Sequence, residues 1–276
     1  MKNKIEVLRV GIVGCGAIGT TLAKAIARDF QGQAKLSALF DIDQVKAQKL
    51  ARMVKGKNLA AASLEALIAR SDLVIECASA RSSAEIAEAV LAKGRDIMVM
   101  SVGGILLQAD KLFSLAQKCN ARIFIPSGAI SGVDALKAAR LKGIKKVTLT
   151  TRKNPLAFKG VEYLSRKKIN LEEIRKDTIL FSGSALKAIK YFPQNINVSA
   201  VLSLAGIGPA KTRVKIVASP STVKNIHEIA IESTAGRIFT RTENIVHPEN
   251  PKTSFMAPLS ALAVLKGIIN PVKIGT

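Results

Sequence analysis

Three glycines near the N-terminus, Gly14, Gly16 and Gly19, have the spacing of a phosphate-binding turn. They follow an apolar stretch, Val10–Val13, and open a segment with apolar residues at helical spacing. In such a turn Gly14 allows the tight bend, Gly16 lets the backbone approach a pyrophosphate, and Gly19 lets helix and strand pack closely. The helix N-terminus adds N–H donors and a positive dipole end. We therefore predict a dinucleotide-binding site that includes Gly14, Gly16, Ala17, Ile18 and Gly19.

A carboxylate stands where the ribose of such a cofactor is expected. Asp41 lies twenty-two residues beyond Gly19, at the end of the second apolar stretch. There it can accept hydrogen bonds from the adenosine ribose hydroxyls, and it would repel a 2′-phosphate. No arginine follows directly in residues 42–44. The sequence thus favours NAD, with NADP still possible.

The chain has two histidines, so a general acid or base that works near neutral pH has few candidates. His227 begins a stretch of alternating polarity, and His247 lies between Val246 and Pro248. Chemistry alone leaves open whether His227 is catalytic or structural. If it is catalytic, we expect it to act as a general acid or base.

Donors for an anionic substrate are expected near the C-terminus. Lys252, Thr253 and Ser254 precede the last helical pattern, where a helix dipole and hydroxyl groups suit an anion, and Asn195 is a second candidate. A helix cap at Thr253 or Ser254 and a turn at Asn195 remain alternatives. No cluster of His, Cys, Asp and Glu has metal-ligand spacing, so we predict no metal.

The elements that position these residues fall into two groups. Through residue 125, apolar strands alternate with helical patterns, which is typical of βαβ units and a parallel sheet. The expected strands are Leu8–Val13, Lys35–Phe40, Leu73–Cys77, Asp96–Val99 and Arg122–Ile125, and the expected helices are Ile18–Arg28, Val45–Met53, Ser83–Lys93 and Ala109–Lys118, with a short helix near Ser63.

Beyond Gly128 the pattern changes to that of an α+β domain with a mainly antiparallel sheet. We expect strands at Lys146–Thr151, Thr178–Phe181, Arg213–Ala218, His227–Glu232 and Arg237–Arg241, helices at Ile130–Arg140, Ser184–Tyr191, Val198–Ala205 and Ser254–Ile268, and a polar surface excursion at Asn154–Lys176. We therefore predict a Rossmann domain with a doubly wound sheet (residues 1–127), a substrate domain (128–250) and a closing helix (251–276) that could return to the first domain.

The composition limits the other classes of function. The net charge is +22, but Lys and Arg are dispersed along the chain and there are only eleven Phe and Tyr residues and no Trp, so a nucleic-acid surface is disfavoured relative to a basic surface that attracts anionic ligands. No uncharged apolar window reaches membrane-spanning length. Three cysteines, an odd count, suit a reducing compartment, and we expect a cytoplasmic protein.

Four further segments resemble, in order and spacing, those of the L-aspartate dehydrogenase family. They are Ile125-Pro126-Ser127-Gly128-Ala129-Ile130, Phe192-Pro193-Gln194-Asn195-Ile196-Asn197-Val198, Asn225-Ile226-His227-Glu228 and Asn250-Pro251-Lys252-Thr253-Ser254. The resemblance implies that His227 is the catalytic histidine and that Ala129 and Asn197 contact the cofactor. The chain departs from the family at Glu162–Lys176, an extra basic stretch, and at Val246-His247-Pro248.

The resemblance also implies an activity, the NAD(P)-dependent oxidative deamination of L-aspartate. The product, iminoaspartate, hydrolyses to oxaloacetate and ammonia or feeds NAD biosynthesis. A homodimer is the usual assembly for such folds. Two alternatives remain at this point: another two-domain oxidoreductase, similar to dihydrodipicolinate reductase or homoserine dehydrogenase, or a non-catalytic NAD-binding regulator that contacts nucleic acid.

Overall fold

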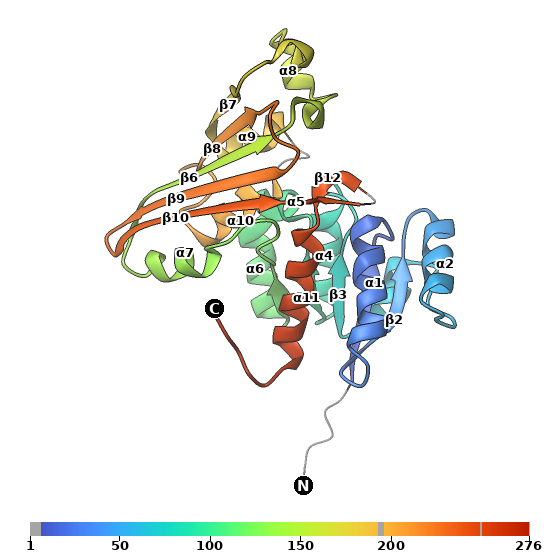
Figure 1. Ribbon diagram of the computed structural model, residues 1–276. Coiled ribbons are helices and arrows are strands. Elements are labelled where there is room, and N and C mark those ends of the chain that lie inside the picture. Colours follow the sequence, from blue (N-terminus) through green and yellow to red (C-terminus); the bar gives the residue numbers. More distant parts are fainter. Residues whose placement is uncertain (1–6, 193–195, 249, 276) are drawn as a thin grey trace. The chain divides into compact units, whose positions relative to one another are not determined.

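The computed structural model describes residues 7–192, 196–248 and 250–275, and its contacts divide the chain into two compact units (Figure 1). The first unit comprises Met1–Pro126 and Pro258–Lys273, and the second comprises Ser127–Ala257 and Ile274–Thr276. The chain therefore leaves the first unit after Pro126 and returns to it at Pro258.

The first unit contains a sheet of five parallel strands in the order β2-β1-β3-β4-β5. Its strands are short and mostly buried or partly buried, which explains why they appear in the sequence as nearly continuous apolar runs. They are β1 (Leu8–Val13), β2 (Ala34–Phe40), β3 (Leu73–Glu76), β4 (Asp96–Val99) and β5 (Ile123–Phe124). Chain order reverses between β1 and β3, and at such a point the carboxyl ends of neighbouring strands leave room for a ligand.

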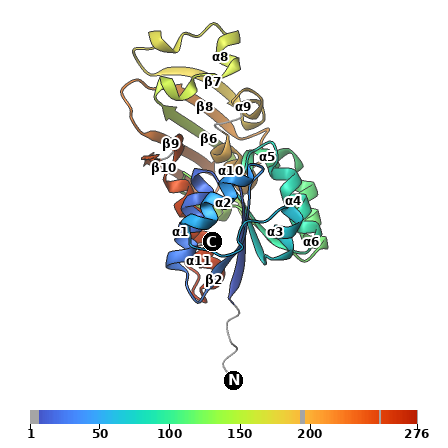
Figure 2. The same ribbon diagram turned by 90° about the vertical axis from the view of Figure 1, so that its right-hand side faces the viewer.

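Helices cover both faces of this sheet (Figure 2). They are α1 (Ala17–Asp29), α2 (Gln44–Met53), α3 (Leu64–Ala69), α4 (Ser83–Ala92), α5 (Val102–Ile105), α6 (Ala109–Lys118) and the 3₁₀ turn η1 (Leu106–Gln108). Val10 and Ile12 pack against α1 and α2, whereas Gly11 on the opposite face approaches Leu67 of α3. The doubly wound architecture predicted from the sequence is confirmed, although the four-residue helix α5 was not predicted.

The last helix, α11 (Met256–Ile269), belongs from Pro258 onward to the first unit. Ala261 and Leu265 are buried in the same apolar cluster as Leu22 and Ile26 of α1. Separately, among the residues that the structure describes, no helix is both long and apolar enough for a membrane crossing.

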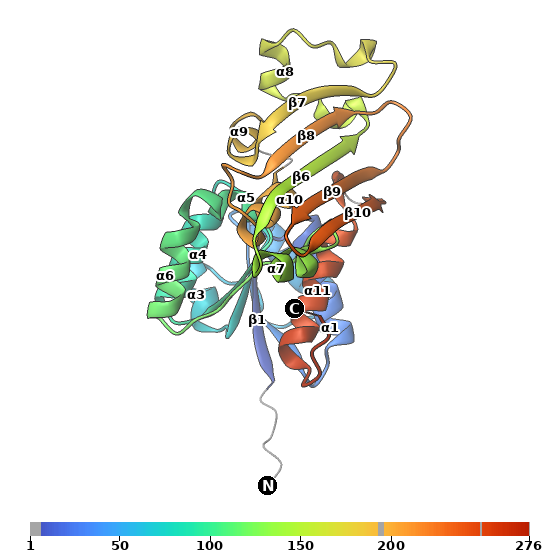
Figure 3. The same ribbon diagram turned by 90° about the vertical axis from the view of Figure 1, so that its left-hand side faces the viewer.

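The second unit contains a five-stranded mixed sheet in the order β10-β9-β6-β8-β7, seen face-on in Figure 3. Its strands are β6 (Ile144–Lys153), β7 (Thr178–Ser184), β8 (Arg213–Ala218), β9 (Asn225–Ser233) and β10 (Gly236–Asn244). Three of the four pairings are antiparallel, as predicted, but β6 and β8 are parallel. Strands β8 and β9 follow each other in the chain but are not neighbours in the sheet, because β6 lies between them.

Helices α7 (Val133–Arg140), α9 (Ala185–Tyr191) and α10 (Asn197–Ala205) pack with this sheet and with one another. The predicted helix from Ile130 begins three residues late, because Gly132 precedes α7 in a left-handed conformation with φ of 81°. The segment predicted as a surface excursion contains α8 (Glu162–Arg166) between the 3₁₀ turns η2 (Pro155–Phe158) and η3 (Leu171–Glu173). It is not merely a surface segment, since Phe158 and Leu164 enter an apolar core with Phe181 and Phe192.

A small hairpin of β11 (Val246–His247) and β12 (Asn250–Ser254) precedes α11 and was not predicted. Residues 252–254 lie in this strand, and α11 begins at Met256, two residues after the predicted start at Ser254. The Ser254 hydroxyl accepts a hydrogen bond from the Met256 N–H at 3.3 Å, so it supports the start of the helix from outside.

Candidate active site

The glycine turn lies between β1 and α1, at the carboxyl edge of the parallel sheet. Gly14 has φ of 92°, and a Cβ there would lie 2.5 Å from the carbonyl carbon of Cys77. A Cβ on Gly19 would collide with the Gly14 carbonyl oxygen, whereas one on Gly16 would meet nothing within 4 Å. Helix α1 has neither a side-chain cap nor an acidic residue in its first turn, so its N-terminus is suited to an anion.

Asp41, at the end of β2, is fixed beside this turn. Its Oδ2 accepts the N–H of Cys15 at 2.7 Å, and its Oδ1 accepts the N–H of Asp43 at 2.9 Å. Burial, and secondarily the Asp41 charge, raise the pKa of the Cys15 thiol to about 12. Cys15 is therefore a neutral packing residue rather than a nucleophile. The side chain of Asp41 is only partly buried, so its carboxylate can still accept from a ribose.

Glu76 is a residue whose role sequence reasoning missed. It ends β3 with no solvent exposure, and its carboxylate accepts the N–H groups of Ala78 at 2.8 Å and Ser101 at 2.9 Å. Burial raises the pKa of Glu76 despite these hydrogen bonds. Because the two bonds join the loops that follow β3 and β4, Glu76 holds the carboxyl edge of the sheet in a fixed shape. The signal available in the sequence was a glutamate directly after the buried run Leu73–Ile75.

In the second unit, His227 lies on the covered face of β9 and is 4% exposed. Its Nδ1 is 3.1 Å from the Oγ1 of Thr151, the residue directly opposite on β6. Burial lowers the pKa of His227 to about 3, and the positive charge of Lys153 contributes to this decrease. The imidazole is therefore neutral at pH 7 and can accept a proton.

Lys153, which the sequence analysis did not single out, lies on the same face, two residues beyond Thr151 on β6. It is 7% exposed, and burial lowers the pKa of its ammonium group to about 8. Its neighbour on β8, Ala218, belongs to the apolar core with Phe158 and Phe192. The predicted strand ended at Thr151; extending its alternation by two residues places Lys153 on the inner face.

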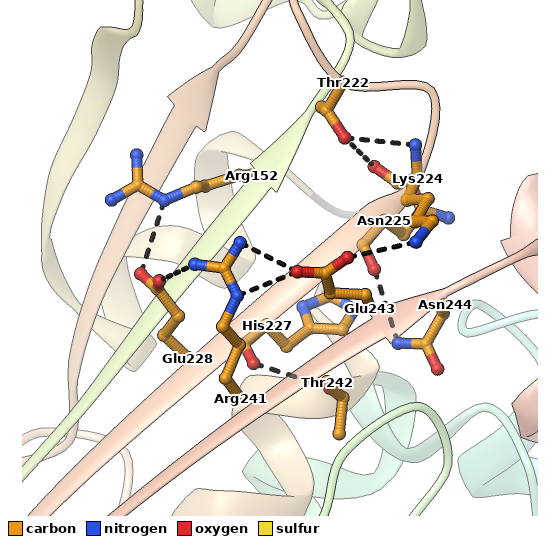
Figure 4. A network of polar contacts seen from close by, with 10 residues as sticks. All are labelled: Arg152, Thr222, Lys224, Asn225, His227, Glu228, Arg241, Thr242, Glu243 and Asn244. Atoms are coloured by element: carbon orange, nitrogen blue, oxygen red, sulfur yellow. Dashed lines mark hydrogen bonds and ion pairs between the residues drawn. The ribbon is translucent and has the colours of Figure 1, made fainter.

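The Ser127-Gly128-Ala129 turn is connected to the same strands through β10. The Ala129 carbonyl accepts hydrogen bonds from Asn244 Nδ2 at 2.9 Å and Thr242 Oγ1 at 3.1 Å. Thr242 pairs with His227 in the β9–β10 register, and its hydroxyl also lies 3.4 Å from the His227 carbonyl oxygen (Figure 4). Two of the predicted site residues, Ala129 and His227, are thus joined through one side chain.

Charged side chains occupy the opposite face of these strands (Figure 4). Glu228 accepts from Arg241 at 2.6 Å and from Arg152 at 3.3 Å, and Glu243 contacts Arg241 at 2.9 Å and Lys224 at 3.1 Å. Because side chains alternate along a strand, this network and the His227 row point to opposite sides of the sheet. It joins β6, β9 and β10, and its solvent exposure makes each pair worth little alone.

The other predicted residues of the second unit lie on elements other than β9 where the structure describes them. Asn197 is exposed as the first residue of α10, Thr253 and Ser254 lie in β12, Lys252 lies in the same strand, and Asn195 falls outside the described residues. Within the described residues no hydrogen bond connects Asn197, Thr253 or Ser254 with the histidine. In that same part of the chain, no group of three or more His, Cys, Asp and Glu could hold a metal ion.

Comparison with known proteins agrees with this geometry. Residues 14–126 match the family model "Homoserine dehydrogenase, NAD binding domain", and residues 134–268 match "Aspartate dehydrogenase, C-terminal". L-aspartate dehydrogenases of Methanosarcina acetivorans and Methanococcoides burtonii are 45% and 42% identical to the chain, in each case over 98% of this chain and all of the relative.

Solved structures give the same result. Aspartate dehydrogenase from Thermotoga maritima is 26% identical, with a TM-score of 0.74 over 97% of this chain and 99% of that one. A hyperthermophilic archaeal homoserine dehydrogenase in complex with NADPH shares the fold, with a TM-score of 0.59 at 14% identity over 95% of this chain and 97% of that one.

The glycine turn, the fixed carboxylate after β2 and the matched nucleotide-binding family together define an oxidoreductase that uses NAD(P). The cofactor prediction is thereby confirmed at the level of NAD(P). At 42 to 45% identity over nearly its full length, the chain belongs to the L-aspartate dehydrogenase family. The similarity to homoserine dehydrogenase in the family models is limited to the nucleotide-binding part, because the second half matches the aspartate dehydrogenase family.

Proposed function

We propose that the protein oxidises L-aspartate to iminoaspartate with NAD or NADP. The observation that carries this proposal is a buried, neutral histidine, bonded to Thr151 and close enough to Lys153 to be affected by its charge, in a chain related over 98% of its length to L-aspartate dehydrogenases. In the reaction, nitrogen loses a proton and the hydrogen on Cα leaves with its electron pair, so that a C=N bond forms. Hydrolysis of the imine releases oxaloacetate and ammonia, and the imine itself is a precursor for NAD biosynthesis.

The first unit provides the groups that bind the cofactor. The N-terminus of α1 and the turn through Gly14, Gly16, Ala17, Ile18 and Gly19 suit the pyrophosphate, and Asp41 suits the adenosine ribose. We assign Ala129 and Asn197 to further cofactor contacts, as the family resemblance implies. The nicotinamide, when bound, accepts the hydride from Cα.

His227 is proposed to accept the proton from the substrate nitrogen, or from the water that attacks the imine. If Nε2 accepts the proton, Nδ1 must carry a hydrogen, which it donates to Thr151 Oγ1 across the 3.1 Å contact. Thr151 then holds the orientation of the ring and accepts from Nδ1 in the tautomer that the reaction needs. Burial keeps the imidazole unprotonated before the substrate binds, and it also weakens the ring as a base, so the role requires an anionic substrate that raises the pKa of His227 when it binds.

The substrate assignment is tested by comparing kcat/KM for L-aspartate, L-alanine and L-glutamate with each cofactor at alkaline pH. A site built for a four-carbon dicarboxylate leaves buried donors unpaired when one carboxylate is missing, so L-alanine should be poorer by about three or more orders of magnitude. L-glutamate should also be poor, since its second carboxylate extends one methylene further. Comparable values for L-alanine and L-aspartate contradict the assignment, and inactivity on all three contradicts the proposed function.

Assembly, substrate contacts and the basic charge complete the proposal. We propose a cytoplasmic homodimer, which light scattering on the purified chain tests, because closed two-fold assemblies are the commonest for soluble enzymes. Asn195, Lys252, Thr253 and Ser254 remain proposed substrate contacts. We also propose that the charge of +22 attracts anionic metabolites rather than nucleic acid, so binding to a DNA or RNA fragment should be weak and lost with added salt.

A further inference from the structure

The covered face of the second sheet changes from apolar to polar at one end. Along β6 the inward residues run Val147, Leu149, Thr151, Lys153, and along β9 they run in the opposite direction from Ile231 and Ile229 to His227 and Asn225. On β10, Thr242 and Asn244 continue the polar row. This polar end therefore combines side chains from three adjacent strands.

Lys153 brings a positive charge to this polar end. The buried polar and charged residues described in the second unit are Thr151, Lys153, Ser199, Ser203, Thr212, Ser219, Asn225, His227, Asn244, His247 and Ser254. None of these described residues is an aspartate or glutamate, so the row contributes cationic and neutral groups. Arg152 and Glu228 alternate with the inward residues, and they pair with each other on the opposite face.

The position of Lys153 relative to His227 suits a small anion. Thr151 lies directly opposite His227, and Lys153 is the next inward residue on β6, which makes it a diagonal neighbour of the histidine across the two strands. Diagonal neighbours lie about 7–8 Å apart and are within reach of a long side chain. A four-carbon amino acid can therefore present its nitrogen to the histidine and a carboxylate to the lysine.

We propose that Lys153 binds a carboxylate group of the substrate. This inference rests on the proposed function, since it assigns the residue a contact in the same reaction. Lys153 is buried on the same face of the sheet as His227, and the attraction between an ammonium group and a carboxylate is strong where water is excluded.

The test uses three variants of the full-length protein. Lys153→Met removes the charge and keeps the length, Lys153→Arg keeps the charge, and Lys215→Met is the matched control on the exposed face of the adjacent strand β8. For each, we would measure kcat and KM for L-aspartate at saturating cofactor, the Kd of the reduced cofactor, and inhibition by succinate. Succinate has two carboxylates and no amino group, so its inhibition reports carboxylate binding without proton transfer.

Lys153→Met should raise KM for L-aspartate by about 100-fold or more and weaken succinate inhibition to a similar degree, while kcat changes less than about tenfold. Lys153→Arg should restore most of the affinity, and Lys215→Met and the Kd of the cofactor should not change. If Lys153→Met leaves both KM and succinate inhibition unchanged, the proposal is overturned. It is also overturned if kcat falls strongly while succinate inhibition stays intact, because that result assigns Lys153 to proton transfer. Wild-type turnover is measured first: if the wild type does not oxidise L-aspartate, the proposed function fails, whereas normal wild-type turnover with an unaffected Lys153→Met variant refutes the role of Lys153 alone.

Discussion

Thr151 and His227 face each other across strands β6 and β9, with Oγ1 and Nδ1 3.1 Å apart and both side chains buried. The Thr151 hydroxyl can donate to Nδ1 or accept from it, so the contact fixes the orientation of the ring in either tautomer. In the tautomer in which Nδ1 carries the hydrogen and Thr151 accepts, Nε2 is the basic nitrogen.

Replacing Thr151 tests this orientation. Thr151→Val keeps the shape and removes the acceptor, so kcat should fall by about 10- to 100-fold while KM and cofactor binding change little. Thr151→Ser keeps the hydroxyl and should retain most of the activity. If Thr151→Val is as active as the wild type, Nδ1 is held by something else and the tautomer argument is wrong.

The two histidines provide a matched pair for the catalytic assignment. His227→Ala should bind NAD(P) normally and lose about two to four orders of magnitude in kcat, the range for removal of a positioned acid or base. His247 is also buried, in β11, where its ring lies 5.5 Å from that of Phe255, so His247→Gln is expected to lower thermal stability rather than turnover. Equal losses of kcat in both variants would remove the basis for choosing His227.

Asp41 is expected to set the cofactor preference. Asp41→Ser should weaken NAD binding and improve the use of NADP relative to NAD, because the repulsion of a 2′-phosphate is removed. Since Asp41 also accepts the Cys15 N–H, Asp41→Asn is the milder variant, which keeps one acceptor oxygen while losing the charge. Asp43→Asn is the control, because Asp43 caps α2 through the Val45 N–H. If both Asp41 variants keep the wild-type ratio of kcat/KM for NADP and NAD, Asp41 does not contact the adenosine ribose.

Glu76→Gln is expected to lower the free energy of unfolding by about 1–3 kcal/mol, because an amide can satisfy only one of the two N–H groups that the carboxylate accepts. The effect should depend on pH. The folded-state pKa of Glu76 is raised above its ordinary value of 4.5, so the wild type binds this proton more tightly when folded and loses stability as pH rises from about 4.5 through the raised pKa. The free energy of unfolding of the wild type and of Glu76→Gln is measured with urea across that pH range. The amount by which the wild type is more stable should decrease as pH rises. An increase would contradict this explanation.

The parts of the site that could be predicted from the sequence are those fixed by local chemistry. The glycine turn depends on a strand, three glycines and a helix that are contiguous, and Asp41 on its place at the end of the next strand. Lys153 and Glu76 depend instead on which residues pair across strands, and neither has a local signature that separates it from a solvated charge. The β11–β12 hairpin was missed for a related reason, since strands of two and five residues give too short an alternation to recognise.

Lys153 also permits a prediction about stability that does not depend on activity. In the folded chain its pKa is about 8, against 10.5 in the unfolded chain, so the folded state releases the proton first and the wild type gains stability as pH rises between these values. Below pH 8 the cost of the buried charge is fully present, at roughly 3 kcal/mol from that difference in pKa. Lys153→Met should therefore be more stable than the wild type at pH 7, with an advantage that decreases above pH 8.

Chemical unfolding of both proteins between pH 7 and pH 10 checks this expectation, with Lys215→Met as the exposed control. A more stable but weakly binding Lys153→Met variant is the pattern expected when a residue is retained for function at the expense of stability. If Lys153→Met is instead less stable than the wild type at pH 7, the lysine contributes to the fold through its contacts, and its burial is no argument for a ligand.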